Sequence, residues 1–190
     1  MPAGDADNDV EDASVREDDP RTLAREICLR LLTFGPRTRA QLADALRKRG
    51  IPDDAADDVL GRYTEVGLID DAAFARAWVE SRHHGRGLSG RALSAELRRR
   101  GVADEEIRDA VAELSPDAEA AAATCLVQQR LAGTRGHSPE VRTRRLAGML
   151  ARKGYPAGLA FRVIREALEA EGTDPPALEE PEFDDLDAGL

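Results

Sequence analysis

The sequence predicts an all-α protein of three tandem three-helix repeats, which form an elongated, curved chain of small bundles. One observation is an element that occurs three times, as ALRKRGI at 45–51, ELRRRGV at 96–102 and MLARKGY at 149–155. Another is that no convincing β-strand is present, since VGLID at 66–70 is short and interrupted by glycine. A third is the low aromatic content of 4%, which indicates thin cores. Units of this size are marginal alone, so adjacent repeats are expected to share surface.

Each copy of the repeated element is expected to end an amphipathic helix. Apolar residues four positions apart lie on one helical face, and such a pair precedes every copy: Leu42 and Leu46, Leu93 and Leu97, and Leu146 and Leu150. The helices should then stop at Gly50, Gly101 and Gly154. Glycine ends helices because it adopts the left-handed conformation without steric cost.

Capping signals predict where these three helices begin. Thr38 and Gln41 have the spacing of a capping box. Ser89 opens the second helix, and Ser138 followed by Pro139 opens the third, because proline suits the first helical position.

One further helix is predicted on each side of the glycine-stopped helix. The leading helices are expected at 23–34, 72–82 and 118–130, the last two introduced by Asp70-Asp71 and Ser115-Pro116. The trailing helices begin at Asp53 or Asp54, at Asp104 and after Pro156. Their expected apolar faces are Val59, Leu60 and Tyr63, then Ile107, Val111 and Leu114, then Phe161, Val163, Ile164 and Leu168.

The charge is distributed unevenly along the chain. The whole chain carries a formal charge of -10, but 1–20 contributes -7 and 171–190 contributes -8, which leaves +5 for the middle. Both ends combine high charge density with few large apolar residues, so they are expected to be disordered acidic tails. The predicted repeats between them are 21–69, 70–115 and 116–170.

The sequence predicts a cytoplasmic monomer without a membrane partner. It begins without the basic and apolar regions of a signal peptide, and no apolar run approaches the length of a membrane span. Cys28 and Cys125 are widely spaced and lack a CxxC pattern, so they are expected to be buried small hydrophobes rather than a disulfide or a metal site.

The basic runs are the candidate contacts with a polyanion or a partner. Cations are favoured in the last turn of a helix, but this does not explain three consecutive charges in two repeats of a basic core. Regular stacking would align them into a stripe that follows a phosphate backbone without reading sequence. The candidate residues are Arg47, Lys48, Arg49, Arg82, Arg86, Arg91, Arg98, Arg99, Arg100, Arg152 and Lys153.

Catalytic, metal and cofactor sites are poorly supported. His83 and His84 lie in HHGRGLS, expected to be a solvated loop without a companion ligand motif. Asp70 and Asp71 stand where a helix start needs a cap. GRGLSG at 85–90 lacks the strand and the Gly-Lys-Ser/Thr of a phosphate-binding loop, so no cofactor is expected.

Phe74 and Trp78 lie at helical spacing in LIDDAAFARAWVESR, and they are expected to pack in the core, with a surface tryptophan anchor as the alternative.

The stretch LIDDAAFARAWVESR, its glycine-containing loop and GRALSAELRRRGV, at 68–102, resemble the RecX family of bacterial recombination regulators. The segments at 35–60 and 144–164 look like flanking repeats, and the resemblance covers about 22–170. The third repeat departs in having Tyr155-Pro156 and the loop GTRGHS.

This resemblance implies a non-enzymatic modulator that binds the RecA filament on single-stranded DNA. Family members block filament extension or promote disassembly, and so suppress ATP hydrolysis, strand exchange and coprotease activity. One alternative is a helix-turn-helix regulator that binds a palindromic duplex as a dimer. A remote third is an enzyme that uses His83 or Asp70.

Overall fold

The computed structural model describes residues 19–173, and this part of the chain consists of helices and connecting turns, as the all-α prediction requires. The predicted tails lie outside the described residues except at 19–20 and 171–173. The elements are α1 (Pro20–Thr33), α2 (Arg39–Arg47), α3 (Asp53–Glu65), α4 (Asp71–Arg86), α5 (Gly90–Arg98), α6 (Asp104–Ala112), α7 (Pro116–Leu131), the 3₁₀ helix η1 (Ala132–Thr134), α8 (Pro139–Arg152) and α9 (Ala157–Ala170). No helix within residues 19–173 is both long and apolar enough to span a bilayer.

The chain divides into two compact units. The first comprises the residues up to Ala77 together with Leu97–Ile107. The second comprises Trp78–Glu96 and the residues from Arg108 onward. The middle predicted repeat therefore contributes residues to both units.

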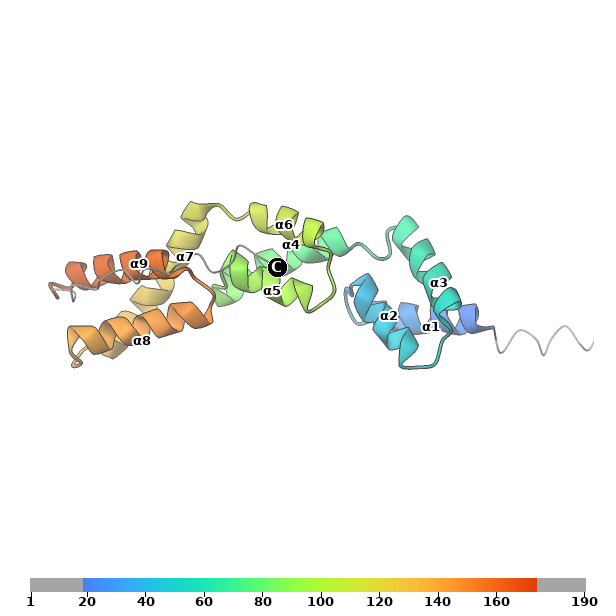
Figure 1. Ribbon diagram of the computed structural model, residues 1–190, viewed down its shortest axis with the longest axis horizontal. Helices are drawn as coiled ribbons and strands as arrows, with labels where there is room; N and C mark the ends of the chain where they lie inside the picture. Colours follow the sequence, from blue (N-terminus) through green and yellow to red (C-terminus); the bar gives the residue numbers. More distant parts are fainter. Residues whose placement is uncertain (1–18, 174–190) are drawn as a thin grey trace, which may run out of the picture. The chain divides into compact units, whose positions relative to one another are not determined.

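In the first unit, α1, α2 and α3 pack pairwise around one apolar cluster (Figure 1). Leu42 and Leu46 of α2 are completely buried in it. Their partners from the other two helices and the following turns are Ala24, Ile27, Cys28, Ile51, Ala55, Ala56, Val59, Leu60, Tyr63 and Ile69. The leucine pair thus faces the core, as its spacing predicts.

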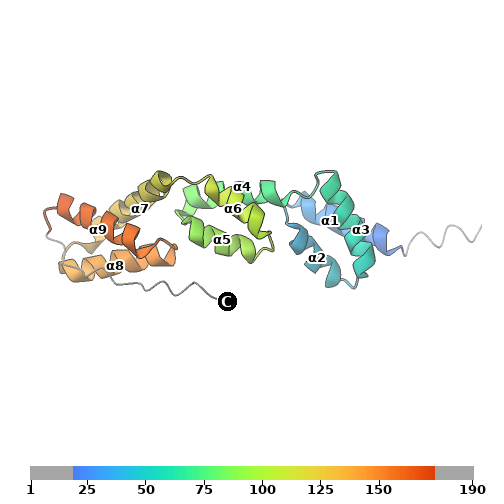
Figure 2. The same cartoon turned by 45° about the horizontal axis from the view of Figure 1, so that its top comes forward.

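In the second unit, α7, α8 and α9 pack pairwise in the same way, and Figure 2 shows this group from a second direction. Leu146 and Leu150 of α8 are 1% and 0% exposed. The other members of this core are Ala123, Val127, Leu131, Tyr155, Ala160, Val163, Ile164 and Leu168. Full burial of a leucine side chain stabilises the folded state by roughly 1.5–3 kcal/mol, so each leucine pair supplies much of the stabilisation that a core of this size can give.

The three repeated glycines end their helices as predicted. Gly50, Gly101 and Gly154 have φ of 74°, 76° and 86°, in the region that disfavours residues with a Cβ. The amide of the apolar residue after each glycine donates a hydrogen bond to the carbonyl of the second leucine of the pair. The N–O distances are 3.2 Å (Ile51 to Leu46), 3.3 Å (Val102 to Leu97) and 3.2 Å (Tyr155 to Leu150). This is the Schellman pattern, and it explains why leucine, glycine and an apolar residue recur together.

Most predicted helix starts are also confirmed. Thr38 and Gln41 form the reciprocal capping box, Ser115 accepts from the amide of Ala118 at 3.1 Å, and Asp70 accepts from the amide of Ala73 at 2.7 Å. Each bond satisfies an amide that the first helical turn leaves unpaired.

The predicted buried face of α4 is wrong. Ala75 and Val79 are its buried apolar residues, with 0% and 3% exposure, whereas Phe74 and Trp78 are only half-buried. Small side chains suit the closely packed face, and the two large rings lie beside it. Cys28 is buried as predicted, but Cys125 is exposed on α7.

Candidate nucleic-acid and partner interface

The N-terminus of α2 receives the basic turn that follows α5. Thr38 is completely buried, and its hydroxyl donates a hydrogen bond of 2.6 Å to the carbonyl of Arg100. A Cβ on Gly101 would come within 2.3 Å of the Ala40 Cβ. The glycine therefore has a second role beyond ending α5, because only a residue without a side chain fits against α2 here.

The N-terminus of α5 receives the basic turn that follows α8 in the same way. The amide of Ser89 donates to the carbonyl of Lys153 at 3.0 Å. A Cβ on Gly154 would lie 2.6 Å from the Ser89 Oγ and 2.7 Å from the Ala92 Cβ. The same contact therefore occurs in two places. The turn after α5 packs on the N-terminus of α2, and the turn after α8 packs on the N-terminus of α5.

A carboxylate accompanies each of these contacts. Asp71 accepts from the amide of Arg39 at 2.9 Å, and Glu119 accepts from the amide of Gly90 at 2.6 Å; both amides belong to the first residue of a helix, where negative charge is favoured. Burial raises the pKa of Asp71, and the hydrogen bond from the Arg39 amide opposes that rise. Burial, with a smaller effect of the Glu119 charge, raises the pKa of Tyr155 to about 12. Asp71 therefore caps α2, a role that the sequence did not reveal.

The first predicted basic run lies at the opposite end of α2. Arg47 pairs with Asp44 at 2.7 Å, and Arg49 donates to the carbonyl of Ala45 at 3.2 Å. Lys48 is exposed, and no carboxylate within residues 19–173 pairs with it. Local helix contacts therefore account for two of these three cations.

The second run, which follows α5, has a similar division of roles. Arg98 pairs with Asp104 at 2.8 Å, and the carbonyl of Arg100 is bound by Thr38. Arg99 is exposed and has no ion-pair partner in the described part of the chain. Because α2 has 9 residues and rises about 1.5 Å per residue, the first two runs are separated along it by roughly 14 Å.

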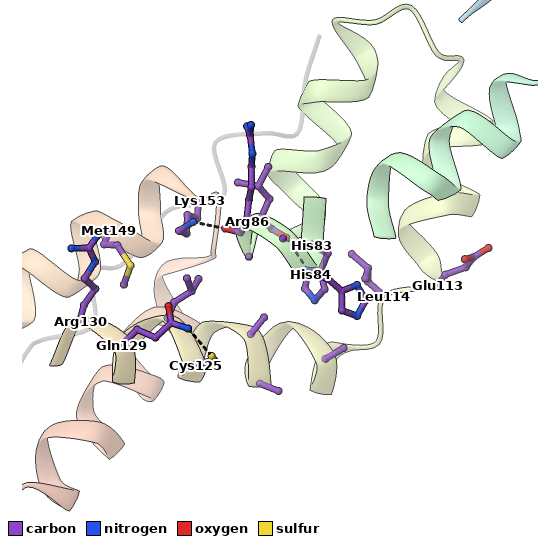
Figure 3. Close-up of a pocket in the computed structure, with 17 residues that line it drawn as sticks. His83, His84, Arg86, Glu113, Leu114, Cys125, Gln129, Arg130, Met149 and Lys153 are labelled. Carbon is purple, nitrogen blue, oxygen red and sulfur yellow. Dashed lines mark hydrogen bonds between the residues drawn. The ribbon is translucent and has the colours of Figure 1, made fainter. Parts of the chain in front are cut away.

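The third run gathers with two other predicted cations in the second unit. The ammonium of Lys153 donates to the carbonyl of Arg86 at the end of α4 (Figure 3), where a cation offsets the unpaired carbonyls. Arg91 lines a hollow together with Gly154. Among residues 19–173 no carboxylate pairs with Arg86, Arg91 or Arg152.

Arg82 is occupied differently from the other candidates. Its guanidinium lies 4.2 Å from the centre of the Trp78 ring, a cation–π contact, and the Trp78 indole donates to Glu96 at 2.9 Å. The tryptophan is thus held at the surface of α4 by polar partners on two sides.

The two histidines are not on a loop, so that prediction is wrong. Both lie in the last turns of α4, which continues through Gly85 to Arg86. His83 is only 6% exposed, and its Nδ1 lies 2.9 Å from the carbonyl of Leu88. His84 is exposed, with Nδ1 2.9 Å from the carbonyl of Glu80. In residues 19–173 no group of three or more His, Cys, Asp or Glu side chains is placed to hold a metal ion.

Two cations that sequence reasoning missed extend the basic surface of the second unit. Arg130, at the end of α7, and Met149 of α8 line both a large hollow and a smaller one. Arg145 and Arg152 line the smaller hollow, and Arg86 and Lys153 line the larger one (Figure 3). The run RTRR at 142–145 was a signal for Arg145; Arg130 is an isolated cation in the sequence.

A buried arginine was also missed. Arg142 is 5% exposed; it donates to the hydroxyls of Thr134 and Thr173, both at 3.0 Å, and to the carboxylate of Glu171. Arg135 binds the same carboxylate at 2.6 Å. These hydrogen bonds hold the pKa of Glu171 below its usual value, with that of Arg142 contributing most.

Arg142 stands twelve residues before Gly154, as Thr38 and Ser89 stand before Gly50 and Gly101. In the third repeat the segment after α9, rather than another basic turn, therefore packs at this position.

Family models match two parts of the chain. A model described as RecX, first three-helix domain, matches 24–62, and one described as RecX, second three-helix domain, matches 70–111. Proteins named Regulatory protein RecX are similar over most of their length. The one from Thermobifida fusca is 62% identical over 161 residues, 85% of this chain and 87% of the relative. The one from Mycolicibacterium smegmatis is 49% identical over 172 residues, 86% of this chain and 90% of the relative.

Two crystal structures share the fold. That of RecX from Lactobacillus salivarius has a TM-score of 0.72 at 19% identity, covering 78% of this chain and 96% of that one. That of a regulatory protein RecX has a TM-score of 0.71 at 20% identity, covering 87% of this chain and 81% of that one.

Proposed function

The chain belongs to the RecX family, and we propose that it is a non-enzymatic regulator that binds the RecA nucleoprotein filament. In this proposal it inhibits filament extension, ATP hydrolysis, strand exchange and coprotease activity, and so restrains recombination and the SOS response in the cytoplasm. The regulatory role follows from the family; the RecA filament as target is the inference from the sequence resemblance.

The observation that most supports a polyanionic target is that only some cations of the first two basic runs make contacts with groups nearby in the chain. Arg47, Arg49 and Arg98 make local contacts that helix ends favour. Lys48 and Arg99 are exposed in the same runs, and no ion pair within 19–173 occupies them. Their charges are therefore available to phosphates or to acidic groups of a filament.

The candidate contacts also indicate the kind of binding. Exposed lysine and arginine side chains such as Lys48 and Arg99 bind phosphate oxygens through their charge, and such contacts carry no sequence information. Binding should therefore be independent of sequence and should weaken steeply as salt is raised.

The test is a titration of the protein, as a monomer, into RecA filaments on single-stranded DNA, with ATP hydrolysis and filament length followed together. We expect both to fall at substoichiometric or stoichiometric ratios. Unchanged hydrolysis and filament length at equal concentrations would rule the proposal out. Sequence-selective binding to a palindromic duplex without an effect on RecA would favour the helix-turn-helix alternative.

A further inference from the structure

The second unit contains two hollows that share lining residues and are together called the groove below. The larger hollow, about 950 Å³, lies against the last turn of α4, α7 and α8. The smaller one, about 340 Å³, lies between the end of α7 and α8. Arg130 and Met149 line both, and Figure 3 shows these two side chains together at one end of the larger hollow.

The groove has an apolar floor and a cationic rim. Leu114, Leu126 and Met149 line the floor of the larger hollow. The cations along the two hollows are Arg86, Arg130, Arg145, Arg152 and Lys153, against the single carboxylate of Glu113. No carboxylate in residues 19–173 pairs with Arg86, Arg130 or Arg152. A ligand that suits the groove is therefore acidic and carries a few large apolar side chains.

The segment 174–190 of the same chain has this chemistry. It contains seven Asp or Glu residues and no Lys or Arg. Its large apolar residues are Leu178, Phe183, Leu186 and Leu190. The N-terminal segment 1–18 also contains seven acidic residues, but it has no leucine, isoleucine or aromatic residue. The C-terminal segment therefore matches both the rim and the floor, whereas the N-terminal one matches only the rim.

The segment also begins beside the groove. Thr173, the last described residue, accepts a hydrogen bond from Arg142, and Arg142 also donates to Thr134. Thr134 lines the smaller hollow. Along α8 the rise from Arg142 to Lys153 is only about 17 Å at 1.5 Å per residue. Seventeen residues can extend to about 56 Å, so 174–190 can follow the whole groove.

We propose that 174–190 docks in this groove, with carboxylates on the arginines and apolar side chains on the Leu126 and Met149 floor. Docking in this way covers Arg86, Arg152 and Lys153, three of the cations assigned above to a polyanion. Since the attraction is partly between exposed charges, salt weakens it. A phosphate backbone or an acidic protein surface then displaces the segment by competing for the same guanidinium groups.

The chain carries its own probe for this docking. Cys125 is exposed and lines the larger hollow, and its sulfur accepts from Gln129 at 3.3 Å (Figure 3). Cys28 is buried in the first unit, so it serves as an internal reference whose reaction requires unfolding. The rate at which a maleimide modifies Cys125 therefore reports whether the groove is covered.

The experiment compares Cys125 alkylation in the natural chain and in a full-length variant whose seven acidic residues in 174–190 are replaced by the corresponding amides. We expect the variant to react at least about threefold faster at low ionic strength, because the tethered segment has a high effective concentration at the groove. The difference should disappear in high salt. A control variant with the seven acidic residues of 1–18 replaced should react like the natural chain.

Equal rates in the natural chain and the 174–190 variant at low ionic strength would overturn the proposal. So would an equal acceleration by the 1–18 control, which would indicate a general charge effect. As an independent check, Arg130→Glu combined with Arg152→Glu should accelerate the reaction of the natural chain, while circular dichroism shows that both helices persist. None of these readouts involves RecA, so they can fail without affecting the proposed function.

Discussion

The turn after α2 and the turns after α5 and α8 share a sequence pattern but differ in their surroundings. A Cβ on Gly101 or Gly154 would collide with the start of another helix, whereas one on Gly50 would meet nothing within 4 Å among the described residues. All three glycines have positive φ. The comparison shows that ending the helix is common to all three copies, while the packing contact belongs only to the two copies that follow another repeat.

The same comparison can be made at the receiving end. Thr38 and Ser89 cap α2 and α5 and hold a basic turn there. In α8 the corresponding position is Arg142, which binds Glu171 and Thr173 after α9. The turn at Gly50 in the first copy thus packs on no other helix start among the described residues. In the last copy, the start of α8 is covered by the segment after α9 rather than by a basic turn.

The largest effect should come from breaking that contact. Arg142→Ala removes a buried guanidinium together with its hydrogen bonds to Thr134, Thr173 and Glu171, so it should lower the free energy of unfolding by about 3–5 kcal/mol. Arg135→Ala removes the exposed partner of the same carboxylate and should cost less than about 1 kcal/mol. Urea unfolding followed by circular dichroism measures both, and equal losses would contradict the distinction.

Replacement of the docked glycine should have the next largest effect. Gly101→Ala adds the strain of a left-handed alanine to a collision with Ala40, for a loss of roughly 2–4 kcal/mol. Gly50→Ala adds the strain alone and should cost about 1 kcal/mol. Thermal or urea unfolding of the two variants side by side tests this, and a Gly50 variant as unstable as the Gly101 variant would refute the packing role.

Loss of the capping hydroxyl should have a smaller effect. Thr38→Val removes the bond to the Arg100 carbonyl and the cap on the Gln41 amide, for a loss of about 1–2 kcal/mol. Thr33→Val is the control, because the Thr33 hydroxyl bonds only to Leu29 within its own helix and is exposed. Amide exchange in the first turn of α2 should accelerate in the Thr38 variant alone, and protection that stays unchanged would argue against the contact.

The smallest effect is a dependence on pH. Because hydrogen bonds from Arg142 and Arg135 lower the pKa of Glu171 in the folded state, its contribution to stability is complete above the unfolded-state pKa. That contribution is lost as the pH falls through the lowered folded-state pKa. The melting temperature of the natural chain should therefore fall more steeply in acid than that of Glu171→Gln; parallel curves would show that the pairing does not stabilise the fold.

Local patterns in the sequence were sufficient to predict most of the fold. The leucine pairs, the glycine stops and the Thr38 capping box all act within one helix and its ends. Their spacing in the sequence is therefore enough to predict where a helix begins, where it ends and which face it buries. The misplaced histidines show the limit of such rules, because Gly85 suggested a loop where α4 continues.

The candidate interface was less predictable, since its geometry depends on contacts between distant residues. Asp71 was expected to help begin α4, yet its carboxylate caps α2. Arginine usually lies at the surface, so the burial of Arg142 could not be expected from its type. It depends on Thr134 and Glu171, which are placed to accept its hydrogen bonds. The sequence located the basic runs. It could not show which of their cations contact groups nearby in the chain, as Arg47, Arg49 and Arg98 do.

We propose that the repeated element uses its glycine for architecture and leaves Lys48 and Arg99 for a polyanionic partner. The most direct test of this proposal is the affinity for RecA filaments on single-stranded DNA of the natural chain, Lys48→Glu with Arg99→Glu, and the control Arg62→Glu with Arg47→Glu, at low salt. Arg62 and Arg47 are exposed cations already paired with Glu65 and Asp44. We expect at least about a tenfold weaker affinity for the first variant, equal to about 1.4 kcal/mol, with unchanged melting temperature and a smaller loss for the control. Equal affinities for the natural chain and the first variant would contradict it.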